Sequence, residues 1–253
     1  MSRNFELLNQ IGLQGVLEPS TSPPAAATAA PEPELGPSTP ALELTGPLRE
    51  EIAKLVVNLF MLPGSVSPRR VVFSGMETGA GCSWTCARVA EVLASQVNGS
   101  VCVVDCNMRS PALHREFMVD NHYGLSDALA QTNPARQYVQ QLSRKNLWLL
   151  SCGTPVEECQ EKVASSKMDQ RLRELQAEFD YVLLDAAPVQ GSNDAMVLAT
   201  LSDGIVLILK ANSTRREVTQ KTVQQMRAAN IPVLGAVLNQ RTFPIPEKIY
   251  NWF

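Results

Sequence analysis

The sequence predicts an α/β domain in which helices flank a doubly wound, mostly parallel sheet. Short apolar segments alternate with longer segments of helical periodicity, and several of the apolar segments have no polar face. Strands that are apolar on both faces are typical of a parallel sheet covered by helices on both sides. Glycine or aspartate follows several of these strands, at the edge of the sheet where this architecture binds its ligands.

Residues 1–47 are expected to form a disordered tail. Residues 1–15 contain one short helical pattern, and residues 18–47 hold eight of the 17 prolines of the chain among Ala, Ser, Thr and Glu. Such a composition offers too little apolar surface to offset the entropy lost on ordering. We therefore predict that the folded domain comprises residues 48–253.

Within this domain the elements follow one another in a regular alternation. An amphipathic helix covers residues 48–60 and ends near Pro63 and Gly64. Strands are predicted at 71–75, 101–105, 146–150, 181–185, 205–209 and 233–238. Helices are predicted at 82–96, 167–178, 192–201 and 215–229.

Composition limits the partners and the location of the chain. The formal net charge is −3, which indicates no general attraction to nucleic acid, and no apolar run approaches the length of a bilayer span. The first residues lack the basic region and apolar stretch of an export signal. We therefore expect a cytoplasmic protein that does not bind nucleic acid.

The six cysteines raise the question of a metal or redox site. Cys82 and Cys86 are four residues apart, and so are Cys102 and Cys106. Zinc-binding cysteines are usually closer together and lie on loops, whereas Cys102 falls inside a predicted strand. We favour structural thiols, because free cysteine is usually buried. A metal or redox pair is the alternative.

A glycine-rich turn and two aspartates converge on the carboxyl ends of the predicted strands. The first strand leads through Gly75, Gly79 and Gly81 into a helix, so backbone N–H groups and the positive helix end face one point, which suits a phosphate. The second strand ends at Asp105 and the fourth at Asp185. Each feature alone is explained by a turn or a helix cap. Together, in this order, they predict a magnesium–nucleotide site.

Several stretches of the domain match one known family. They are residues 74–90, 103–111, 123–129, 149–153, 179–185, 203–204 and 234–239. On these stretches residues 48–253 resemble the cytoplasmic tyrosine kinases of bacterial capsule and exopolysaccharide synthesis. Those kinases are similar to P-loop NTPases of the MinD and ParA type, so the resemblance implies a P-loop fold that binds ATP or ADP with Mg²⁺.

The resemblance also implies residue roles and partners. Asn239 matches a position that contacts adenine in the MinD-like relatives. Tyr250 is the one tyrosine at the place of the kinases' phosphorylated tyrosine cluster; we favour a packing aromatic beside Trp252 and Phe253, and a phosphoacceptor is the alternative. The implied partner is a membrane polysaccharide copolymerase, or chain-length regulator, which would recruit the chain to the inner face of the membrane, and the implied assembly is a homo-oligomer. The nucleotide contacts implied are Gly79, Ala80, Gly81, Cys82, Ser83, Trp84 and Asn239, the magnesium ligands Ser83, Asp105 and Asp185, and the catalytic residues Asp105, Asp185 and Arg109.

Three departures from the family pattern bear on catalysis. Cys82 stands where the phosphate loop of the family carries lysine, Glu77 stands where the MinD-like proteins carry a second lysine, and Asn107 replaces an aspartate. A cysteine cannot neutralise the β- and γ-phosphates as an ammonium does. If the helix N-terminus lowered its pKa, the resulting thiolate would repel phosphate.

An arginine is the alternative source of positive charge. Arg109 is the best candidate, because it matches a family arginine and follows the strand that carries Asp105. Arg69, Arg70 and Arg88 are also close to the loop in the sequence.

Three functions follow from these patterns. We favour a regulatory or scaffold protein with weak or absent phosphoryl transfer and residual nucleotide binding. An active tyrosine autokinase that uses an arginine is the second interpretation, and a MinD- or ParA-like ATPase is the third. Only part of the family's ring-forming pattern is present, at Glu51, Lys54 and Val57.

Overall fold

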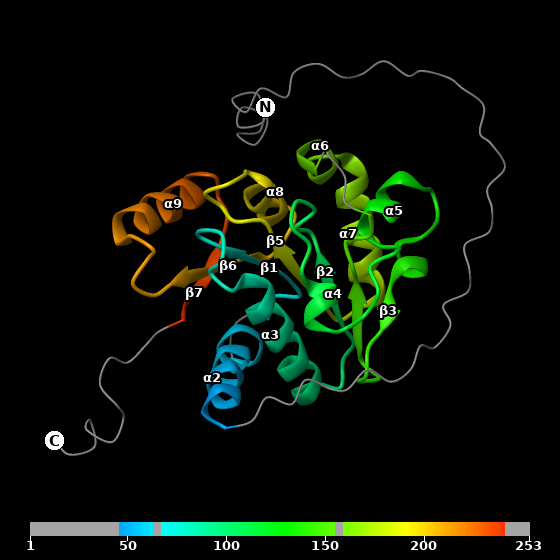
Figure 1. Cartoon of the computed structure of the whole chain (residues 1–253), viewed down its shortest axis with the longest axis horizontal. Helices are drawn as coiled ribbons and strands as arrows, with labels where there is room; N and C mark the ends of the chain where they lie inside the picture. The colour runs from blue at the N-terminus through cyan, green and yellow to red at the C-terminus, as the bar shows by residue number, and fades with distance from the viewer. Residues whose placement is uncertain (1–45, 63–66, 155–158, 241–253) are drawn as a thin grey trace.

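The computed structural model describes residues 46–62, 67–154 and 159–240 (Figure 1). These residues form a seven-stranded sheet in the order β3-β4-β2-β5-β1-β6-β7, with helices on both of its faces. Most of the predicted tail, residues 1–45, lies outside the described residues, and so does Tyr250.

The sheet is parallel at every pairing except that of β3 with β4. This confirms the predicted fold class. All six predicted strands are present, and β3 was not predicted because it consists of two glutamines. The strands are β1 (Arg70–Gly75), β2 (Val101–Asp105), β3 (Gln140–Gln141), β4 (Leu147–Leu150), β5 (Tyr181–Ala186), β6 (Gly204–Lys210) and β7 (Val233–Asn239).

The predicted helices are present, and several short ones accompany them. The longest, α3, has the predicted bounds, whereas α4, α5, α6 and the single turn η2 are too short for a periodic pattern to reveal them. The first helix begins at Pro47, one residue before the predicted domain boundary, and continues into a π-helical turn, η1. The elements are α2 (Pro47–Val56), η1 (Val57–Met61), α3 (Cys82–Gln96), α4 (Leu113–Glu116), α5 (Leu125–Ala130), η2 (Ala135–Tyr138), α6 (Cys159–Val163), α7 (Ser166–Glu178), α8 (Asp194–Thr200) and α9 (Arg216–Ala228).

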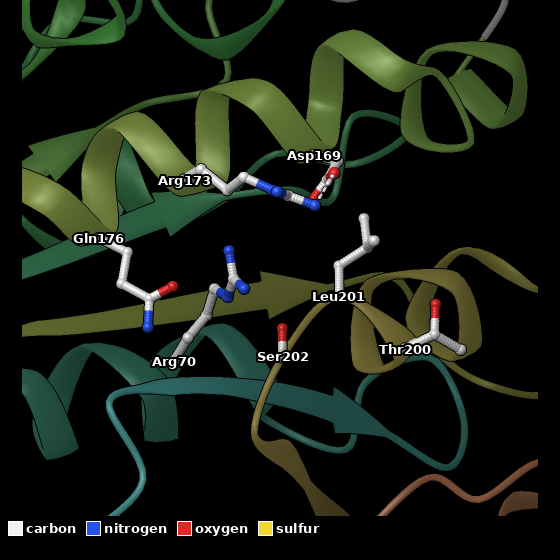
Figure 2. Close-up of a pocket in the computed structure, with 7 residues that line it drawn as sticks. All are labelled: Arg70, Asp169, Arg173, Gln176, Thr200, Leu201 and Ser202. Carbon is white, nitrogen blue, oxygen red and sulfur yellow. Dashed lines mark hydrogen bonds and ion pairs between the residues drawn. The ribbon is translucent and has the colours of Figure 1, made fainter.

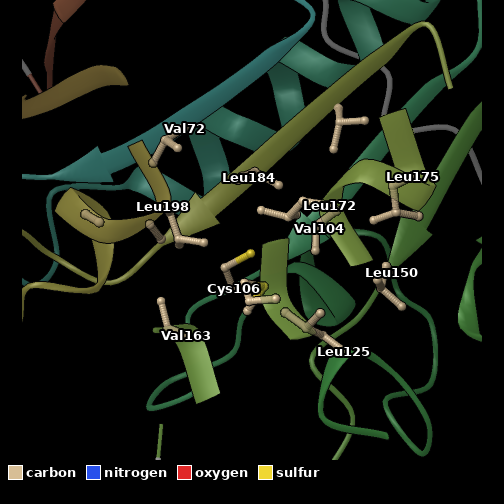
Figure 3. Packing of buried hydrophobic residues seen from close by; sticks show 14 of the residues in the cluster. Val72, Val104, Cys106, Leu125, Leu150, Val163, Leu172, Leu175, Leu184 and Leu198 are labelled. Carbon is tan, nitrogen blue, oxygen red and sulfur yellow. The ribbon is translucent and has the colours of Figure 1, made fainter. Parts of the chain in front are cut away.

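The central strands are buried on both faces, because successive side chains point to opposite sides of the sheet. Val72 of β1 packs with Val104 and Leu184 under α5, α7 and α8 (Figure 3). Its neighbours Val71 and Phe73 pack on the other face, against α2 and α3. As we inferred from the sequence, these strands are apolar on both faces because a layer of helices covers each face of the sheet.

A buried arginine fastens α5 to α7. Arg171 donates from Nε to the carbonyl of Ala128 (2.8 Å) and from Nη2 to the carbonyl of Gln131 (2.7 Å), which satisfies two carbonyls at the end of α5. Its Nη1 pairs with Glu174 at 2.8 Å. The guanidinium is therefore buried with its charge and its donors partnered.

Within the described residues, no helix combines the length and apolarity needed to cross a membrane.

Candidate functional site

The loop between β1 and α3 has the backbone form that a phosphate loop requires. Gly79 and Gly81 have φ values of +78° and +82°, in the left-handed region that favours glycine. Gly81 is the residue before the first turn of α3, and no side chain caps that turn. The backbone N–H groups of the first turn of α3 are therefore available to a ligand oxygen.

Two amide side chains from the end of β7 hold this loop. Asn239 donates from Nδ2 to the carbonyl of Ala80 (2.9 Å), and Gln240 donates from Nε2 to the carbonyl of Gly79 (2.9 Å). A Cβ on Gly81 would collide with Asn239 Nδ2. Asn239 therefore lies at the loop with its amide bonded to the loop backbone, and its predicted contact with adenine stays a prediction. Gln240 was not predicted, since nothing local marks a residue that follows the last strand.

The two predicted aspartates face each other across neighbouring strands. Asp105 and Asp185 are register partners at the ends of β2 and β5, and both are fully buried. The carboxylate of Asp105 accepts three backbone N–H groups, from Asn107 (3.2 Å), Ala112 (2.9 Å) and Leu113 (3.0 Å). It thereby orders the segment after β2 and fixes its own orientation.

Asp185 has a different environment. Neither carboxyl oxygen has a well-formed hydrogen bond. Burial raises the pKa of Asp185, the negative charge of Asp105 raises it further, and the nearby Ser83 hydroxyl and Cys82 thiol offset this in part. The charged groups that act on it most strongly, Asp105 and Glu116, are both negative. The site therefore contains a buried carboxyl group that lacks a positive partner.

Cys82 is a neutral thiol. Although the residue as a whole is partly exposed, burial of its sulfur raises the pKa of the thiol well above the usual value, and Asp185 and Cys86 raise it further. Of the two alternatives, a neutral thiol and a thiolate at the helix N-terminus, the raised pKa favours the neutral thiol, because burial beside a carboxyl group outweighs the helix dipole. The lysine position holds no charge.

Further buried thiols surround the aspartates. Cys86 and Cys106 are completely buried, and the pKa of each is raised by burial first and then by the charges of Asp105 and Asp185. Sequence reasoning did not place them here, because only the fold brings β2 beside β5 and α3. Across the described part of the chain, no set of three or more His, Cys, Asp or Glu side chains is arranged to hold a metal ion.

The candidate arginines are mostly engaged elsewhere. Arg109 lies beyond the end of β2, and its Nε is 3.6 Å from Oδ2 of the buried Asp194 at the start of α8. Arg88 is buried between Glu91 and Glu116. Arg109 therefore stays a candidate, and an ion pair with Asp194 already holds it.

Arg69 and Arg70 do not belong to the site. β1 runs from Arg70 to Gly75, so they lie at the opposite end of the sheet, where Arg69 donates to the carbonyls of Phe179 (3.2 Å) and Asp180 (2.9 Å). Their proximity to the loop in sequence is therefore not proximity in space.

The remaining loop residues have structural contacts. Glu77 accepts a hydrogen bond from the hydroxyl of Thr214 (2.8 Å), which ties the loop to the turn before α9. Trp84 packs against the core, with the Arg88 guanidinium 5.8 Å from its ring centre. Trp84 therefore supports α3, and its predicted nucleotide contact stays a prediction.

This combination of phosphate loop, paired aspartates and parallel sheet agrees with comparisons to known proteins. Residues 69–230 match the family described as cellulose biosynthesis protein BcsQ. The chain belongs to the BcsQ family. Among curated relatives of this BcsQ-family chain, the tyrosine-protein kinase YwqD of Bacillus subtilis is 29% identical over 171 residues, which cover 68% of this chain and 72% of YwqD.

Solved structures share the fold of the BcsQ-family chain. The chimerical protein CapA2B2 aligns with a TM-score of 0.72 at 23% identity, over 78% of this chain and 87% of that chain. The cell division ATPase MinD of Pyrococcus furiosus aligns with a TM-score of 0.59 at 22% identity, over 73% of this chain and 78% of that chain. The resemblance to tyrosine kinases and to MinD-type P-loop NTPases is confirmed.

Proposed function

We propose that this chain is a regulatory or scaffold protein of exopolysaccharide production, with weak or absent phosphoryl transfer and residual binding of ATP or ADP. The neutral Cys82 at the lysine position, beside two buried carboxyl groups, carries this proposal. In P-loop enzymes the lysine offsets the charge of the β- and γ-phosphates. At this position the chain offers the outer phosphates no positive side chain.

The rest of the site fits a nucleotide with magnesium. The unpartnered oxygens of Asp185, next to the Ser83 hydroxyl, suit a hard cation that prefers oxygen ligands. The uncapped first turn of α3 suits a phosphate. Ser83, Asp185 and Asp105 would hold the ion, which when bound would supply positive charge to the phosphate oxygens. Residual binding therefore depends mainly on backbone groups and carboxylates that the chain retains.

Catalysis is expected to suffer more than binding. Removing one well-placed charge-assisted contact costs about 2–4 kcal/mol of transition-state stabilisation, a rate loss of tens to about a thousandfold. Arg109 would have to leave Asp194 to replace the lysine. This movement would leave the buried carboxylate of Asp194 without its positive partner. The second function, an active autokinase, therefore requires a rearrangement around α8.

The proposed partner is a membrane polysaccharide copolymerase that recruits the chain to the inner face of the membrane. This proposal rests on the BcsQ family description and on the relatives named as tyrosine kinases. Self-association is part of the same proposal. In α2, Lys54 pairs with Glu51 at 2.6 Å on an exposed face, so these two residues of the partial ring-forming pattern are at the surface.

Calorimetric titration with ATP and ADP, each with and without magnesium, tests the nucleotide proposal. We expect weak binding by the wild type and at least tenfold tighter ATP binding by Cys82→Lys. Cys82→Met is the matched control, because it adds volume without charge and should not strengthen binding. Equal affinities of the wild type and Cys82→Lys would contradict the assigned role of this position.

Incubation with magnesium-ATP and a phosphotyrosine readout tests the catalytic part. We expect little or no phosphotyrosine on the wild type. Strong autophosphorylation that Arg109→Ala abolishes would establish the active kinase instead. Dimerisation on a sizing column that depends on ATP would favour the MinD-like interpretation.

A further inference from the structure

A polar hollow lies at the opposite end of the sheet from the phosphate loop. It has a volume of about 400 Å³ and opens to solvent between β1, α7 and the end of α8 (Figure 2). Arg70 begins β1 on the face of the sheet that carries Val72. The lining residues are Arg70, Asp169, Arg173, Gln176, Thr200, Leu201 and Ser202.

The guanidinium of Arg70 lines this hollow, and Asp203 and Asp169 stabilise its charge. Its Nε and Nη1 are shielded from water and have no hydrogen-bond acceptor in the described part of the chain. The nearby Asp203 is occupied by the backbone, because its Oδ2 accepts the N–H groups of Arg69 (2.6 Å) and Arg70 (2.8 Å). Arg70 as a whole is half-buried, and shielded donors without an acceptor are costly, so an external anion that reached them would stabilise the side chain.

A second guanidinium faces it across the hollow (Figure 2). Arg173 on α7 is held in a two-pronged pair by Asp169, with Nε to Oδ1 at 3.1 Å and Nη2 to Oδ2 at 2.7 Å. This pair fixes the direction of the side chain and does not use Nη1. Two arginines and one aspartate line the hollow, and Asp203 beside it also stabilises the charge of Arg70, so the attraction for an anion rests on the unbonded donors of the two arginines.

The positions of the two arginines favour phosphate over carboxylate. A planar carboxylate is satisfied by one guanidinium fork, as Asp169 is, whereas a tetrahedral phosphate has oxygens for donors from two walls. Gln176 adds an amide on the same face of α7 as Arg173.

The hydroxyls in the lining indicate what else the ligand carries. Thr200 donates its hydroxyl hydrogen to the carbonyl of Val197 (2.7 Å), and Ser202 donates to that of Leu198 (2.8 Å). Their oxygens can then only accept, which suits hydroxyl donors on a ligand. Leu201 is the single apolar residue among the lining residues, so a nucleotide base would find no aromatic or apolar wall.

We propose that this hollow binds a small phosphate ester that bears hydroxyl groups, such as a sugar phosphate. The phosphate lies between Arg70 and Arg173, and the hydroxyls meet Gln176, Thr200 and Ser202. This site is separate from the nucleotide site and does not depend on the function proposed for it.

Calorimetric titration of the full chain with glucose 1-phosphate tests this proposal. We expect saturable binding by the wild type that is at least tenfold weaker in Arg70→Gln and in Arg173→Gln. Arg227→Gln, which changes an exposed arginine on α9, and Ser83→Ala, which changes the phosphate-loop site, should bind as the wild type does. Thermal unfolding of each variant shows that it is folded. If Arg70→Gln does not fold, the affinity of Arg173→Gln tests the proposal, because the side chain of Arg173 is largely exposed and its replacement should leave the fold intact.

Further arms of the titration identify the ligand class. Inorganic phosphate should bind more weakly than the ester, and glucose and a glutamate-rich peptide should not bind. The proposal is wrong if glucose 1-phosphate does not saturate, or if it binds Arg70→Gln and Arg173→Gln as tightly as the wild type. Loss of binding in Ser83→Ala would move the ligand to the phosphate loop. Equal affinity for inorganic phosphate, or preference for the peptide, would refute the ester class.

Discussion

Asp185→Asn is expected to make the protein more stable at neutral and alkaline pH. The carboxyl group is fully buried, the Ser83 hydroxyl and the Cys82 thiol offer it only weak hydrogen bonds, and its pKa is raised from 3.8 to about 8. An amide has nearly the same shape and never ionises. The substitution therefore removes the cost of burying a negative charge next to Asp105.

The sign and size of the effect follow from linkage. Because the pKa is raised in the folded state, that state binds the proton more tightly than the unfolded chain. The stability that this group contributes is therefore present below pH 4 and is lost as the pH rises towards 8. At about 1.4 kcal/mol per pH unit the full span approaches roughly 6 kcal/mol. We expect a gain of about 2–4 kcal/mol for the variant at pH 8, because relaxation and water entry reduce the cost in the wild type.

Urea unfolding followed by circular dichroism, at pH 5 and pH 8, measures this difference. Asp105→Asn is the informative contrast, because its carboxylate accepts three backbone N–H groups and an amide can accept fewer, so this variant should be destabilised. Asp120→Asn, at an exposed residue, should show no change. If the free energies of unfolding of wild type and Asp185→Asn differ by the same amount at both pH values, the reasoning about this carboxyl group is refuted.

Two other substitutions test the packing around the loop and the sheet. Gly81→Ala should lower the free energy of unfolding by about 2–3 kcal/mol, because it adds a collision with Asn239 to the cost of a left-handed alanine. Gly79→Ala, where a Cβ meets no atom within 4 Å, should cost only about 1 kcal/mol in the same urea titration, and equal losses would contradict the collision. Arg171→Met should lower the free energy of unfolding by about 2–4 kcal/mol in thermal or urea unfolding, because it leaves the carbonyls of Ala128 and Gln131 without a donor. An unchanged free energy of unfolding would show that water replaces the guanidinium.

Local patterns in the sequence predicted the elements that are long and have one consistent period. The helix at 82–96 was predicted to the residue, because a glycine-rich turn precedes it and helical spacing continues to its end. The two-residue strand β3 and the four-residue helix α4 carry no period at all. Such elements depend on the neighbours that they pack against, and those neighbours are distant in the sequence.

The same limit applies to the site. Asp105 and Asp185 were predicted to meet, because the ends of parallel strands share one edge of the sheet. The clamp formed by Asn239 and Gln240 was not predicted, since it joins residues about 160 positions apart. Arg70 is close to the loop in the sequence but not in space, because the whole length of β1 separates them.

The unusual pKa of Asp185 and the unusual residue at position 82 have one physical origin. A lysine ammonium beside Asp185 would favour the ionised carboxylate and lower its pKa, whereas the neutral thiol only donates a weak hydrogen bond and leaves burial to dominate. Cys82→Lys should therefore change two properties together. The stability gained by Asp185→Asn at pH 8 should largely disappear in the Cys82→Lys background, because the carboxylate then has a partner that the amide lacks. A double-mutant cycle on these two positions separates this coupling from changes in packing, and additive effects of the two substitutions would show that the thiol and the carboxyl group act independently.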